Sequence, residues 1–150
     1  MIRNETDYQE AIRRLEEDRE VAKRQREVLE AQGYSAEQVE RGMEPLLSFH
    51  QQFAEEVAWY EAVRRGNIPV IRRLTDIGRL LIASRIAIGL TQRQLADRLN
   101  VSEGVVSRDE RNEYHGITVE RAQRILGCLG VTIAISIDET AIHREAIVTA

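Results

Sequence analysis

The sequence predicts a mainly α-helical protein, because apolar residues recur at helical spacing, helix-capping residues separate the apolar stripes, and a single short segment alternates like a strand. The chain has 150 residues, of which 43% are hydrophobic, so it is long enough for one compact domain or two small modules. We expect a helical hairpin over residues 1–66, a second helical domain with a C-terminal β-strand over 67–138, and a tail over 139–150.

The N-terminal region predicts two antiparallel helices. Apolar side chains from Tyr8 to Leu29 form a narrow stripe among charged residues, which is typical of an amphipathic helix exposed to solvent. Gly33 ends this helix, and Ser35 with Gln38 forms a capping box for the next one. Because Pro45 lacks a backbone N–H donor, we expect the second helix to kink or restart there.

A second group of helices is expected after the sequence "GNIP". Gly66 suits a helix end, and Pro69 suits the first turn of a following helix. That helix is expected from about Val70 to Ile88 and is apolar on more than one side. We therefore expect it to be covered twice, by its own domain and by either the hairpin or a second subunit.

The stretch "TQRQLADRLNVSEGVVSRDE" predicts two short helices joined by a tight turn. Thr91 and Gln94 form a capping box for the first helix, and Asn100 is a residue type that tolerates a left-handed turn. Ala96 is small enough for two helix backbones to approach each other. Ser102 is placed to cap the second helix, which is expected from about residue 103 to 113.

These residues, with "TVERAQRILGCLGV" after them, resemble the Xre/Cro-CI type of helix-turn-helix over about Ile77 to Val131. The resemblance implies a lambda-repressor-like bundle whose second helix enters the major groove of double-stranded DNA. It also implies that Arg85 and Glu110 join the first helix of the bundle to the end of this recognition helix. The candidate DNA-binding residues are Gln92, Arg93, Glu103, Gly104, Val105, Ser107, Arg108 and Asn112.

The resemblance, together with side-chain chemistry, implies different roles for these candidates. Gln92, Arg93 and Asn112 are expected at phosphates, with bracing of the recognition helix as an alternative for Gln92. In the groove, Glu103 can accept from a cytosine amino group, and Arg108 can donate to guanine or phosphate. The family often has Gln and Ser where this chain has Glu103 and Gly104.

A second departure from the family is Asp109, at a position that is usually apolar. Either Asp109 pairs with an arginine, or the end of the recognition helix is altered.

The charge distribution is compatible with DNA binding despite a net charge of −4. Residues 1–66 hold 10 Lys/Arg against 15 Asp/Glu, whereas residues 79–126 hold 8 arginines against 6 acidic residues. Attraction to phosphate depends on the charge of the face presented, so a mildly basic module beside an acidic one can bind DNA.

The segment "VTIAISID" predicts a strand with one buried face, formed by Val131, Ile133, Ile135 and Ile137. A lone strand leaves its backbone groups unpaired, so we expect it to pair with the same strand of a second subunit, or else with "ETAIHREAIVTA". The first arrangement is similar to HipB-type antitoxins, and the N-terminal helices loosely resemble those of some HigA-type antitoxins.

Together these features predict a homodimeric, sequence-specific DNA-binding repressor in the cytoplasm, antitoxin-like and paired with a toxin protein. The alternatives are a stand-alone phage-type repressor and a protein-interaction adaptor that does not bind DNA. No spacing of Cys and His resembles a metal site, Cys128 lies among leucines, and no catalytic arrangement is evident, so no enzyme activity, cofactor or metal is expected. No apolar run is long enough to span a membrane.

Overall fold

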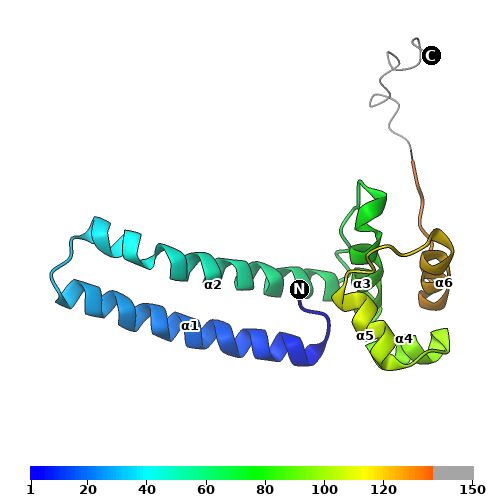
Figure 1. Ribbon diagram of the computed structural model, residues 1–150, viewed down its shortest axis with the longest axis horizontal. Helices are drawn as coiled ribbons and strands as arrows, with labels where there is room; N and C mark the ends of the chain where they lie inside the picture. The colour runs from blue at the N-terminus through cyan, green and yellow to red at the C-terminus, as the bar shows by residue number, and fades with distance from the viewer. Residues whose placement is uncertain (137–150) are drawn as a thin grey trace, which may run out of the picture.

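The computed structural model describes residues 1–136, and within this range it consists of six α-helices and one 3₁₀ helix (Figure 1). A long hairpin of two helices extends from a compact bundle formed by the remaining helices. The elements are α1 (Glu5–Ala31), α2 (Ala36–Arg64), η1 (Leu74–Asp76), α3 (Ile77–Ala87), α4 (Gln92–Leu99), α5 (Glu103–Arg111) and α6 (Val119–Leu129).

The hairpin follows its capping residues closely. Asn4 accepts a hydrogen bond from the Asp7 amide and so begins α1 before the apolar stripe does. The predicted capping box of Ser35 and Gln38 at the start of α2 is confirmed. Of the kink or restart expected at Pro45, the restart was wrong, because α2 runs through this proline as one helix, while the kink stays a prediction. Pro45 is exposed, so the carbonyl that it leaves without a partner is open to solvent and the cost of the missing hydrogen bond is small.

The predicted start of the next helix was also wrong. Residues 67–71 have no regular structure, and α3 begins only at Ile77, after the short η1. Ile68 stands before a proline, which disfavours helical backbone at that residue. Val70 and Ile71 are β-branched and lose side-chain freedom in a helix, which also disfavours a helix over this segment.

Helix α3 lies at the centre of the molecule and is covered on two sides, as expected. Leu81, Ile82 and Ala83 are fully buried in one continuous core. Helix α2 contacts α3 from one side, and α6 contacts it from the other. We considered the hairpin and a second subunit as the structure that packs on the second side of α3. The structure shows the hairpin of the same chain in this position.

The N-terminal segment also packs on this core, which the sequence did not predict. Ile2 is buried among the core residues, and the backbone carbonyl of Arg3 accepts a hydrogen bond from the side chain of Arg85. The first residues of the chain therefore fasten the hairpin to the helical bundle.

No strand is formed within residues 1–136. After α6, Gly130 adopts a left-handed conformation and residues 131–136 continue without regular structure. Val131 and Ile133 pack against the core, whereas Ile135 is 75% exposed. Ile137 and the tail lie outside the described residues. A strand needs a second backbone to pair with, and the described chain offers none here, so pairing between subunits stays a prediction.

In the part of the chain that the structure describes, no helix is both long enough and apolar enough to cross a membrane.

Candidate nucleic-acid interface

Helices α4 and α5 are joined by a turn with a defined backbone geometry. Thr91 and Gln94 form the capping box at the start of α4. Asn100 takes the left-handed conformation, with φ 57° and ψ 47°. The amide of Val101 then donates to the carbonyl of Ala96 at 3.0 Å. Ala96 itself is buried, so the small residue lies where the two helices approach each other.

Helix α5 presents one face to the core and another to solvent. Val106 and Glu110 are buried, and Arg108 stands two residues from each of them. Residues two apart on a helix point to nearly opposite sides, so Arg108 lies on the outermost line of α5. Gly104 and Arg111 are exposed one turn before and one turn after it. This outward face is open to solvent.

A buried ion pair connects α5 to the centre of the bundle. Arg85 of α3 is 2% exposed and Glu110 of α5 is 1% exposed. The Arg85 guanidinium donates from Nε to Glu110 Oε1 at 2.5 Å and from Nη2 to Oε2 at 2.7 Å. Arg85 also donates to the carbonyls of Leu90 and Arg3, both at 2.7 Å. One side chain therefore orients the recognition helix relative to α3 and the N-terminal segment.

Gln92 joins the same network from α4. Its Nε2 donates to Glu110 Oε2 at 2.7 Å, and the side chain is half-buried. The carboxylate of Glu110 thus accepts three hydrogen bonds, which satisfies a charge that would be costly to bury alone. Of the two roles considered for Gln92, this contact is the one that bracing of α5 requires.

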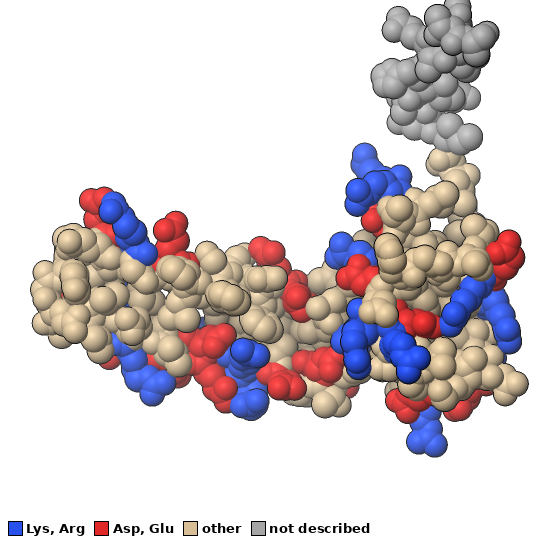
Figure 2. Space-filling model, in the orientation of Figure 1, with Lys and Arg blue, Asp and Glu red and all other residues tan. Residues whose placement is uncertain are grey.

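The arginines of the bundle divide into two groups by their contacts. Arg98 and Arg124 donate to the carbonyls of Cys128 and Leu99, and Arg121 pairs with Asp109. These three side chains hold the bundle together. Within helices α3 to α6, the arginines that form neither an ion pair nor a side-chain hydrogen bond are Arg79, Arg93, Arg108 and Arg111. Figure 2 shows the basic side chains on this part of the molecule, with acidic side chains between them.

Asp109, the acidic residue at a position that is usually apolar in the family, pairs with an arginine. Its carboxylate accepts from Arg121 of α6, so the first of the two alternatives is observed. Next to it, burial raises the pKa of Tyr114, with a further contribution from the carboxylates of Glu110 and Asp109. Tyr114 is therefore neutral at ordinary pH and acts as a packing residue at the end of α5.

The remaining candidates lie around the outward face. Glu103 and Gly104 are exposed at the start of α5, and Asn112 is exposed at its C-cap. Val105 and Ser107 are half-buried on the flanks. Ser102 occupies the N-cap position, but its side chain forms no capping hydrogen bond, so the cap expected there is only partly realised.

Two exposed arginines of the domain, one on α5 and one on α3, were not among the candidates chosen from the sequence. Arg111 lies one turn beyond Arg108, and its spacing from Gly104 could have placed it on the outward face. Arg79 of α3 carries no such signal, because its exposure depends on how α3 packs.

Comparison with known proteins identifies this region. Residues 81–135 match the family model described as helix-turn-helix. The match begins within α3 and includes α4, α5 and α6, and it covers less than half of the chain. Searches among curated proteins and among solved structures returned no match. Residues 81–135 are therefore similar to Xre-like helix-turn-helix domains, and this likeness supports a DNA-binding transcriptional regulator.

Proposed function

We propose that this protein is a sequence-specific repressor that binds a palindromic operator as a homodimer. The observation that carries the proposal is the outward face of α5, where Arg108 and Arg111 are unpaired while Arg85 and Glu110 hold the helix from behind. A rigid helix with free donors on its exposed side fits the requirements of major-groove reading. Two copies related by a two-fold axis would place their recognition helices about 34 Å, or one helical turn of DNA, apart.

Each candidate residue has a distinct part in this proposal. Arg93 and Asn112 contact phosphates and set the register, joined by Arg111, while Gln92 acts through Glu110. The base-reading residues are Glu103, Val105, Ser107 and Arg108, with Gly104 allowing the close approach of the helix to the groove. Binding would take place in the cytoplasm, where the operator is.

Selection of bound sequences from a random DNA library tests the proposal. We expect an enriched inverted repeat with the native protein and its loss with Arg108→Ala, since removing a groove arginine costs about 1–3 kcal/mol. Arg13→Ala, an exposed arginine of α1, is the matched control and should select the same repeat. No enrichment by the folded native protein at low salt would refute DNA reading and favour the adaptor alternative.

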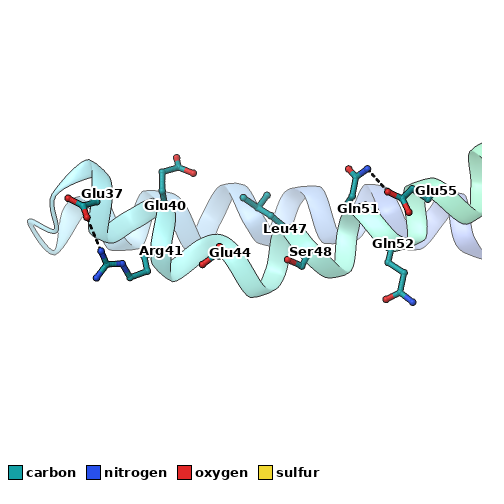
Figure 3. A pocket seen from close by; sticks show the side chains of 9 residues that line it. All are labelled: Glu37, Glu40, Arg41, Glu44, Leu47, Ser48, Gln51, Gln52 and Glu55. Atoms are coloured by element: carbon teal, nitrogen blue, oxygen red, sulfur yellow. Dashed lines mark hydrogen bonds and ion pairs between the residues drawn. The ribbon is translucent and has the colours of Figure 1, made fainter.

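The antitoxin-like role is a second part of the proposal, with a stand-alone repressor as the alternative. It is supported by the outer face of α2, which carries four glutamates and a single arginine around an open hollow (Figure 3). Glu37 pairs with Arg41, and Glu40 pairs with Arg26 of α1, which leaves Glu44 and Glu55 without a cationic partner in the described chain. Such a face suits a basic protein partner.

Co-purification from the native host tests this second part. We expect a basic protein to remain bound to the native chain and to be released by Glu44→Lys. Glu20→Lys, which reverses an exposed acid on α1, should keep the partner. Absence of any stable partner would leave the stand-alone repressor.

A further inference from the structure

The half of the hairpin that lies far from the helix-turn-helix domain has almost no core of its own. The fully buried residues of α1 and α2 are mostly near the domain, where they join the continuous core. In the far half only Val39 and Met43 are buried, and neither belongs to that core. Helices in proteins depend for their stability on packing of an apolar face, so two helices with this little shared burial need a further covering surface.

One side of the far half offers such a surface, which we call the hairpin stripe. An open groove of about 400 Å³ runs between the helices on this side, and none of its lining residues carries a charge. Val28 continues the row of Val21 and Gln25 by one helical turn. The hairpin stripe consists of Val21, Gln25, Val28, Gly42, Pro45, Leu46 and Phe49.

No charged residue lines this groove. In the orientation of Figure 2, basic and acidic side chains gather along the upper and lower edges of the hairpin, and the far half between them is mainly uncharged. The opposite side of α2 holds the four glutamates of Figure 3. Residues 1–66 have an excess of five acidic residues, so two such hairpins can approach each other only through an uncharged surface.

The shape of the hairpin stripe is self-complementary. Phe49 is 66% exposed and projects beside the groove, whose depth comes from Gly42, where α2 approaches Leu29 of α1. A two-fold interface uses the same patch on both subunits, so it needs a projection and a recess side by side. The stripe has both, and the Phe49 ring of one copy would enter the groove of the other.

The hairpin is also large enough for a stable dimer. Helices α1 and α2 have 27 and 29 residues, which makes each about 40 Å long at 1.5 Å per residue. Two packed helices are about 20 Å wide, so hairpins lying face to face would cover about 800 Å² per copy, the usual area of a specific interface. The stripe would form the apolar part of this area in the far half of the hairpin, and the charged edges would form its rim.

We propose that the hairpin stripe is the surface through which two copies of this chain associate, giving a parallel four-helix arrangement with the two DNA-binding domains side by side at the same end. The inference rests on the homodimer of the proposed function and names its interface. It differs from dimerisation through the segment that contains Ile135, the arrangement expected from the sequence alone.

Analytical ultracentrifugation of the full chain without DNA tests this interface. We expect the native chain to be dimeric and Phe49→Glu to dissociate at least about tenfold more readily, because a buried aromatic anchor is replaced by an unpaired charge. The matched control is Leu47→Glu, which places the same charge on the other side of α2, at a residue that is 41% exposed, and should leave the dimer intact. Circular dichroism should show unchanged helix content in both variants, since neither residue is buried.

The other outcomes separate this inference from the proposed function. If Phe49→Glu stays dimeric while Ile135→Lys becomes monomeric, the hairpin interface is refuted and the homodimer stands. If the native chain is monomeric at the highest concentration that can be measured, both the interface and the homodimer are refuted. Selection from the random DNA library is performed independently, so failure of DNA binding would not change the result on the hairpin stripe.

Discussion

Replacing Glu110 with alanine is the most direct perturbation of the recognition helix. The carboxylate of Glu110 accepts two hydrogen bonds from Arg85 and one from Gln92, all between 2.5 and 2.7 Å, and both charged side chains are almost inaccessible. Glu110→Ala leaves the Arg85 guanidinium buried without its counter-charge. Breaking a buried ion pair on one side costs about 3–5 kcal/mol of unfolding free energy.

The structure places this variant at the lower end of that range. Arg85 keeps two acceptors after the substitution, the carbonyls of Leu90 and Arg3, so its charge remains partly satisfied. We therefore expect a loss of about 3 kcal/mol. Urea unfolding followed by circular dichroism measures it, and operator affinity should fall as well because α5 loses its support.

A double variant serves as the control for this prediction. Arg85→Leu with Glu110→Leu removes both charges, so no unpaired charge stays buried, and much of the lost stability should return. The reasoning would be refuted by a loss below about 1 kcal/mol in Glu110→Ala, or by a double variant at least as unstable as the single one.

Two further predictions concern the end of the recognition helix. Gly78→Ala should lower the unfolding free energy by about 2 kcal/mol or more in the same urea assay, because an added Cβ would lie 1.8 Å from the backbone oxygen of Glu113. A variant as stable as the native protein would contradict the close packing of α3 against the end of α5. The pKa of Tyr114 is raised above 10.0, chiefly by burial, so the unfolded chain loses this proton first as pH rises and stability should fall above about pH 10. Tyr114→Phe should show a smaller fall between about pH 9 and pH 11, and equal falls in both proteins would exclude the effect.

The sequence predicted the fold best where short-range effects decide the structure. The capping boxes at Ser35 and Thr91 and the left-handed Asn100 depend on residues within one helical turn, and all three are present. The extended segment around Val70 was taken for a helix because a proline beside an apolar run is compatible with both conformations. Pro45 did not cause the helix to restart, because one missing hydrogen bond did not interrupt a long helix.

The candidate interface was only partly predictable. Gly104 and Arg108 could be placed on the outer face of α5 from helical spacing, and the structure leaves both exposed. Which arginines are free could not be predicted, because pairing depends on neighbours distant in the sequence. Arg111 and Arg121 are both exposed arginines on helices of the domain. Arg121 pairs with Asp109, whereas Arg111 pairs with no residue of the described chain.

By itself, the sequence determined the helical class, the helix-turn-helix and the line of residues that faces outward, because periodicity and capping act over a few residues. Only the tertiary structure decided how the parts are joined. Arg85 meets the carbonyl of Arg3 across 82 positions of sequence and Glu110 across 25, and no local pattern encodes these distances. The groove beside Phe49 likewise exists only because α1 and α2 pack side by side, which places two separate rows of uncharged residues on one surface.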